Sequence, residues 1–198
     1  FAAQGARGAV AAAVLSGTEV VFENITNKAT VSAIGNIPDS DDCAGGIVGL
    51  INNAAANVSF INCENNAAIT GLNQIGGIAG FVKAAASVTF DGCVNNGAIA
   101  ETGTSAYSAG IVCRSDAEST TFKKCVNNAT ISAGKDQAGG MLAYAAKGSF
   151  VIDGCVNNGT IAPTTGKAAG IAANINCGDA DGAKGYSVTI TNCVNNGS

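Results

Sequence analysis

The stretch VTFDGCVNNGAI at residues 88–99 determines the architecture, because related stretches recur along the whole chain of 198 residues. Each copy begins with apolar residues, continues through Phe or Ile towards Cys, and closes on Asn, and successive copies are 30 to 38 residues apart. The copies lie near residues 20–31, 58–69, 88–99, 120–131, 150–161 and 188–198. A period of this length is typical of stacked repeats, in which each unit packs only against its neighbours.

A second motif, rich in glycine, separates these copies and reads IGGIAG around Gly76 and Gly80. The motifs consist of three to six residues with alternating apolar character, which is the strand pattern, and no segment keeps a helical period. We therefore predict one all-β domain over residues 1–198: a parallel β-helix of about six coils, each of about 30 residues with three short strands. Neither end reads as a cap, since the chain starts inside a coil and stops at CVNNGS.

Stacking of equivalent residues predicts two structural ladders. The asparagines that close the copies should pass amide hydrogen bonds from coil to coil; they are Asn27, Asn65, Asn95, Asn127, Asn157 and Asn195. The Asn or Gly that follows them should take the left-handed backbone of a bend. A column of buried thiols should act as small hydrophobes; it consists of Cys63, Cys93, Cys125, Cys155 and Cys193, with Ile25 in the first copy.

The remaining cysteines, Cys43, Cys113 and Cys177, are better candidates for disulfides, although the sequence does not pair them. The chain has no histidine and no CxxC spacing, so we expect neither a metal site nor a cofactor. The lack of histidine also excludes Ser-His-Asp and Cys-His nucleophiles.

A net charge of −4 without basic clusters argues against nucleic-acid binding. No apolar run is long enough to insert into a membrane.

The repeats resemble a known family. The G-G-I-x-G segments, such as Gly76 to Gly80, followed by V-x-F-x-x-C-x-N-x-G-x-I, resemble the GLUG-type repeats of bacterial surface proteins. They are more distantly similar to the G-G-A-I/F-x-x-N repeats of polymorphic outer-membrane adhesins. The resemblance covers nearly the whole chain and implies an extracellular, often adhesive, right-handed β-helix. It implies no catalytic residues.

Several positions could carry a modification or a ligand. If the source is a eukaryote, N-x-S/T triplets offer glycosylation sites at Asn24, Asn57, Asn128, Asn158 and Asn196. Two insertions, at residues 32–43 and 174–186, should protrude as loops, and their carboxylates could bind Ca²⁺; these belong to Asp39, Asp41, Asp42, Asp179 and Asp181. Against this stands the simpler interpretation of solvated acidic loops.

Two outward columns suggest weaker alternatives. Asp91, Lys123 and Asp153 form a mixed-charge stripe that a polysaccharide-cleaving β-helix could use, although alternating surface charge between stacked strands is the favoured interpretation. Sugar platforms also need exposed aromatics, for which only the tyrosines are candidates; they are Tyr107, Tyr144 and Tyr186. An ice-binding solenoid would need a flat Thr or Ala array, which one column suggests: Thr30, Ala68, Ala98, Thr130 and Thr160.

We therefore predict a non-enzymatic, extracellular or cell-surface protein with a structural or adhesive role, as an adhesin stalk, a spacer or a head-to-tail fibre subunit. Its expected partners are other copies of itself or adjoining repeats at the uncapped ends, and host or matrix surface ligands. The alternative is a carbohydrate-binding or polysaccharide-cleaving β-helix, and the remote alternative is an ice-binding solenoid.

Overall fold

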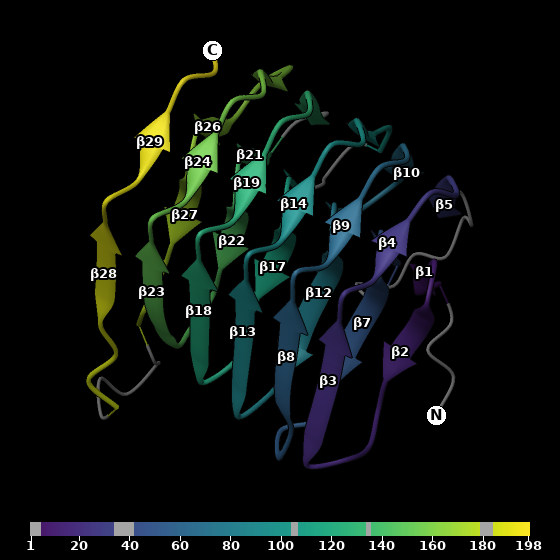
Figure 1. Ribbon diagram of the computed structural model, residues 1–198. Helices are drawn as coiled ribbons and strands as arrows, with labels where there is room; N and C mark the ends of the chain where they lie inside the picture. The colour runs from purple at the N-terminus through teal and green to yellow at the C-terminus, as the bar shows by residue number, and fades with distance from the viewer. Residues whose placement is uncertain (1–4, 34–41, 104–106, 134–135, 179–183) are drawn as a thin grey trace.

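The computed structural model describes residues 5–33, 42–103, 107–133, 136–178 and 184–198. Its regular secondary structure is entirely β, and all pairings between strands are parallel. Equivalent strands of successive turns lie side by side, so that the chain advances as a solenoid from the N-terminal to the C-terminal end (Figure 1). The predicted all-β parallel β-helix is confirmed.

Each complete turn contributes one strand to each of five sheets. Sheet A contains β1 (Arg7–Gly8), β6 (Cys43–Gly45), β11 (Gln74–Gly76), β16 (Tyr107–Ala109), β21 (Gln137–Gly139) and β26 (Lys167–Ala169). Sheet B contains β2 (Ala11–Val14), β7 (Val48–Asn52), β12 (Ala79–Ala84), β17 (Val112–Ser115), β22 (Leu142–Ala145) and β27 (Ala172–Ile175). Sheet C contains β3 (Glu19–Glu23), β8 (Asn57–Ile61), β13 (Ser87–Asp91), β18 (Ser119–Lys123), β23 (Ser149–Asp153) and β28 (Val188–Thr191).

The two remaining sheets are narrower. Sheet D contains β4 (Thr26–Asn27), β9 (Glu64–Asn65), β14 (Val94–Asn95), β19 (Val126–Asn127), β24 (Val156–Asn157) and β29 (Val194–Asn195). Sheet E contains β5 (Val31–Ala33), β10 (Ile69–Gly71), β15 (Ile99–Glu101), β20 (Ile131–Ala133) and β25 (Ile161–Pro163). The prediction of three strands per coil is therefore wrong, because sharp bends divide the repeat into five short segments.

The bend between sheets C and D explains part of this division. It uses a left-handed residue in every turn, such as Asn62 with φ of 49° and Gly92 with φ of 61°. Gly and Asn tolerate this backbone with little steric cost, whereas Lys124 adopts it with φ of 50°. The left-handed residue directly precedes the Cys column, so its predicted place after the asparagine column is wrong.

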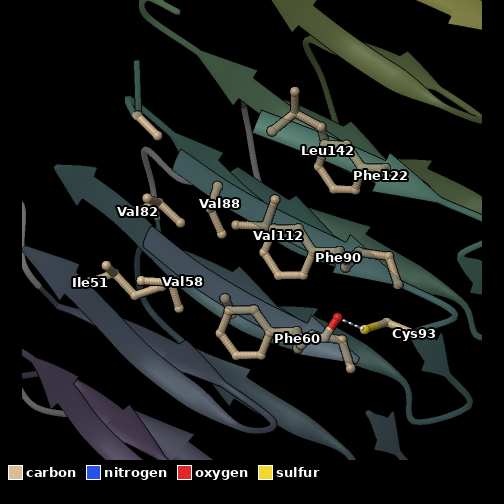
Figure 2. Packing of buried hydrophobic residues seen from close by; sticks show 14 of the residues in the cluster. Ile51, Val58, Phe60, Val82, Val88, Phe90, Cys93, Val112, Phe122 and Leu142 are labelled. Atoms are coloured by element: carbon tan, nitrogen blue, oxygen red, sulfur yellow. Dashed lines mark hydrogen bonds between the residues drawn. The ribbon is translucent and has the colours of Figure 1, made fainter. Parts of the chain in front are cut away.

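The main hydrophobic core lies between sheets B and C. The rings of Phe60, Phe90 and Phe122 stack with centroids 4.9 and 5.2 Å apart. Val112 and Leu142 of sheet B pack in the same cluster, as Figure 2 shows. Burial of each aromatic or aliphatic side chain contributes about 1.5–3 kcal/mol. The register is therefore fixed strongly, since a slip of one residue would turn this whole row to solvent.

A second, smaller core lies between sheets A and E, where Ile69, Ile99 and Ile131 of sheet E pack near Ile75 of sheet A. The two cores leave the short strands of sheet D at the edge of the cross-section, with its asparagines pointing inwards. The buried asparagine row therefore lies on sheet D, beside both cores.

Candidate functional site

The predicted asparagine ladder is present and runs through the interior. Asn65, Asn95 and Asn127 are fully buried. The Nδ2 atom of Asn65 donates to Oδ1 of Asn95 at 2.8 Å and to the carbonyl of Ala67 at 2.9 Å. Equivalent amide bonds of 2.8 to 2.9 Å join the whole series from Asn27 to Asn195. Every Nδ2 donates towards the C-terminal turn, so this inner ladder has a direction.

A second ladder on the surface was not predicted. The asparagines directly after the inner ladder bond to one another at 2.8 to 2.9 Å; they are Asn66, Asn96, Asn128, Asn158 and Asn196. Here Nδ2 donates towards the N-terminal turn, opposite to the inner ladder. The repeated Asn-Asn pair was the available signal, but a sequence does not reveal which way an amide points.

The cysteine column lies next to the phenylalanine row, and all its members except the half-buried Cys193 are buried. Four of its thiols donate to a main-chain carbonyl of the preceding turn, as Cys93 Sγ does to the Phe60 oxygen at 3.4 Å (Figure 2), and the fifth, Cys155, donates to Asp153 of its own turn. None of the eight cysteines forms a disulfide, Cys43, Cys113 and Cys177 included. Burial raises the pKa of Cys113 and Cys125 well above that of an exposed thiol. Within the described ranges, no three acidic or thiol side chains gather as a metal site would require.

The proposed glycosylation positions are engaged in hydrogen bonds. Asn128, Asn158 and Asn196 are exposed members of the surface ladder, and each donates its Nδ2 to a neighbouring amide. Asn57 donates Nδ2 to Glu19 at 2.7 Å, and Asn24 takes the left-handed bend with φ of 54°. A glycan on the Nδ2 of a ladder asparagine would replace one of its two hydrogens and leave the other to donate.

The mixed-charge stripe forms as predicted by the register, because Asp91 pairs with Lys123 and Lys123 with Asp153 on adjacent strands. Asn192 and Thr191 each donate to Oδ1 of Asp153 at 2.8 Å, and these bonds lower its pKa. Lys123 stands between the two carboxylates. The arrangement is that of charges alternating across neighbouring strands.

The calcium candidates are only partly described. Asp39, Asp41, Asp179 and Asp181 lie outside the described residues. Asp42 has an exposed fraction of 1%, and desolvation raises the pKa of its carboxyl group.

The Thr and Ala column considered for ice binding is exposed at every position: Thr30, Ala68, Ala98, Thr130 and Thr160.

An arginine–tyrosine cluster interrupts the apolar repeat, and it consists of Phe81, Tyr107, Arg114, Asp116 and Tyr144. The Arg114 guanidinium carbon lies 4.8 Å from the Phe81 ring centre and 5.1 Å from that of Tyr144. The Tyr144 ring stacks on Tyr107 with centroids 5.2 Å apart. Arg114 also donates to Asp116 from Nε at 3.0 Å and from Nη2 at 2.6 Å. Two of the three tyrosines therefore come together around a fixed guanidinium.

The third tyrosine belongs to a separate network around Glu118. Tyr186 donates to a Glu118 carboxylate oxygen at 2.6 Å, Lys184 at 2.9 Å and Lys147 at 3.0 Å. These bonds, that of Tyr186 first, lower the pKa of Glu118 to about 2. The network ties the end of the second insertion to the strand that begins 67 residues before Tyr186, next to Glu118.

Val188 and Ile190 on β28 are 43% and 46% exposed, whereas their counterparts Val88 and Phe90 in the third turn are buried. A hollow beside Asn195 is lined by Ile161, Ala168, Ala169, Gly170 and Ser198. The described residues include no helix that could cross a membrane.

Comparisons with known proteins leave the family open. No protein-family model, no curated protein and no solved structure matches the chain.

Proposed function

We propose that this chain is a non-enzymatic structural module, a β-helical rod that serves a surface protein as a stalk, a spacer or a fibre subunit. The observation that carries the proposal is the pair of amide ladders with opposite directions, the inner one continuous from Asn27 to Asn195 and the outer one from Asn66 to Asn196. Continuous ladders join each turn to the next and resist shear between turns, as stacked amides do in cross-β assemblies.

The distribution of polar groups supports the same role. The buried asparagines bond to one another and to main-chain groups of their own turn, so they are committed to holding turns together. The thiols are committed to main-chain carbonyls. Groups that are fully engaged inside a repeat stabilise it rather than act on a substrate.

The extracellular or cell-surface location rests on the resemblance to GLUG-type repeats. Antibodies raised against the chain should label intact cells of the source. Labelling that appears only after the cells are permeabilised would contradict the location. The six strands of a sheet, spaced about 4.8 Å apart, make the solenoid about 25–30 Å long along its axis. Small-angle X-ray scattering should show one compact, stiff particle of that size, and an expanded or flexible chain would contradict a stiff spacer or stalk.

Carbohydrate binding is a second candidate function, and the arginine–tyrosine cluster favours it. The half-buried rings of Tyr107 and Tyr144 lie beside the paired polar groups of Arg114 and Asp116. Aromatic surface next to fixed polar groups suits a sugar. Retention on immobilised polysaccharides should be lost in Tyr144→Ala and kept in the control Tyr186→Ala. Equal retention of the two variants would rule out this cluster as the sugar site.

A further inference from the structure

We propose that the cysteine column binds soft monovalent metal ions, such as Cu(I) or Ag(I), with one ion held between the thiolates of neighbouring turns. The column consists of Cys63, Cys93, Cys125, Cys155 and Cys193. The first four are fully buried, so the site lies inside the solenoid and not on its terminal turns. This binding activity goes beyond the structural role proposed above and does not rest on it.

The main chain places the thiols of successive turns next to one another. The amide of Val126 donates to the Cys93 carbonyl at 2.9 Å, and the same bond recurs in the neighbouring turns. Residues paired in this way across parallel strands lie about 4.7–4.9 Å apart. The side chains of Cys63 and Cys125 both lie within hydrogen-bonding reach of the Cys93 thiol. Each internal thiol therefore has one thiol neighbour in the turn before it and one in the turn after it.

This spacing suits an ion that binds two thiolates in a line. A bond between a metal and a thiolate sulfur is about 2.3 Å long, so a linear sulfur–metal–sulfur unit spans about 4.6 Å. That length agrees with the separation of neighbouring strands in a parallel sheet. Cu(I) and Ag(I) are soft ions that accept two ligands in a line, and thiolates are the ligands that soft ions prefer.

The same geometry excludes other classes of metal ion from the column. Zinc in a structural site takes four ligands that converge as a tetrahedron. Among the described residues, no three acidic or thiol side chains converge in this way. Calcium and magnesium bind oxygen ligands and not thiols. An ion with two ligands needs only one pair of neighbouring thiols, which the column offers in every gap.

The charges of a filled column nearly cancel. The thiol protons are now held only by weak bonds to carbonyl oxygens, such as that from Cys93 to Phe60 at 3.4 Å, and binding would release them. Five thiolates and four monovalent ions carry five negative and four positive charges, which leaves a net charge of −1. This balance matters because an unpaired charge is costly to bury. Lys124, which directly precedes Cys125 and is exposed, opposes the remaining negative charge.

Retention of silver tests the site, and Ag(I) is the probe because it needs no reductant. The chain is refolded from urea in the presence of Ag(I), so that burial of the thiols does not limit access. Dialysis against a monothiol then removes ions that are held by a single cysteine. The five thiols of the column leave four gaps, so about four silver ions per chain should remain. They should give a thiolate-to-silver charge-transfer absorption in the near ultraviolet.

Cysteine variants locate the retained ions. Cys125→Val interrupts the column in its middle and removes two gaps, so about two ions should remain, and Cys93→Val should give the same loss. The column tolerates an apolar residue, because Ile25 occupies this position in the first turn. The matched control is Cys113→Val, which removes an equally buried thiol outside the column and should retain about four ions.

Circular dichroism should show that all three variants are folded. An unmodified chain that retains fewer than two silver ions would overturn the site, as would equal losses from the column variants and the control. Neither result would affect the structural role, which is tested separately by surface labelling and small-angle scattering.

Discussion

Asn127→Ala is the sharpest test of the inner ladder, because it removes one fully buried member from the middle of the series. The side chain donates to Asn157 at 2.8 Å and to the Ala129 carbonyl at 3.0 Å, and it accepts from Asn95 at 2.9 Å. Alanine leaves the Nδ2 of Asn95, the Oδ1 of Asn157 and the Ala129 carbonyl oxygen buried without this bond. The neighbouring Asn128 makes two ladder bonds of 2.8 Å on the surface, which makes Asn128→Ala the matched control.

The expected magnitudes follow from burial. A buried polar group that loses its partner costs about 1–3 kcal/mol, so three such groups should lower the free energy of unfolding by about 3–9 kcal/mol in Asn127→Ala. Water replaces the lost partners at the surface, and Asn128→Ala should therefore cost about 0.5 kcal/mol. The two changes delete the same atoms from adjacent residues, so the difference between them reflects burial together with the one additional bond of Asn127.

Urea unfolding followed by far-ultraviolet circular dichroism measures both costs, and amide hydrogen exchange shows whether the loss is local to the neighbouring turns. Exchange should accelerate most in the turns that contain Asn95 and Asn157. Equal costs for the two variants, or a cost below about 1 kcal/mol for Asn127→Ala, would refute the claim that the inner ladder holds the turns together.

Three further predictions concern the core, the acid response and the thiols. Phe90→Ala should lower the free energy of unfolding by about 3–5 kcal/mol in urea titrations, because it empties a fully buried site between two stacked rings. Tyr186, Lys184 and Lys147 lower the pKa of Glu118 to about 2 from its ordinary 4.5, so the stabilisation from these three bonds should be complete above pH 4.5 and lost as the pH falls through 2. The NMR titration of Glu118 measures this, and a midpoint near 4.5 would contradict it. All eight cysteines should react with a thiol reagent in denaturant without reductant. In the folded protein Cys113 and Cys125 should react slowest, and rapid labelling of either would contradict their burial.

The fold and the inner ladder could be predicted from the sequence because a solenoid places like residues in rows. The spacing of Phe60, Phe90 and Phe122 already contains the register that the strands adopt. The position of the bends was predicted wrongly, because Asn and Gly occur both before and after the Cys column. Either place was compatible with a left-handed residue, and Lys124 at one of the bends offered no signal.

The arginine–tyrosine cluster was missed for a different reason. Phe81, Arg114 and Tyr144 occupy one row directly after the glycine-rich motif, so the sequence contained their register but not the contact with Tyr107. Tyr107 reaches Tyr144 from another sheet. Contacts between unlike residues in different turns depend on how tightly the backbone folds between sheets A and B, which no single stretch of sequence encodes.

The sequence by itself determined that this chain is a stack of parallel strands with asparagine in one buried row, because repetition at a constant period imposes one register on every turn. Only the tertiary structure decided the direction of each ladder. An amide can donate either way along a row, and its choice depends on main-chain carbonyls such as that of Ala67 that compete for the same Nδ2. That direction is opposite in the inner and the outer ladder.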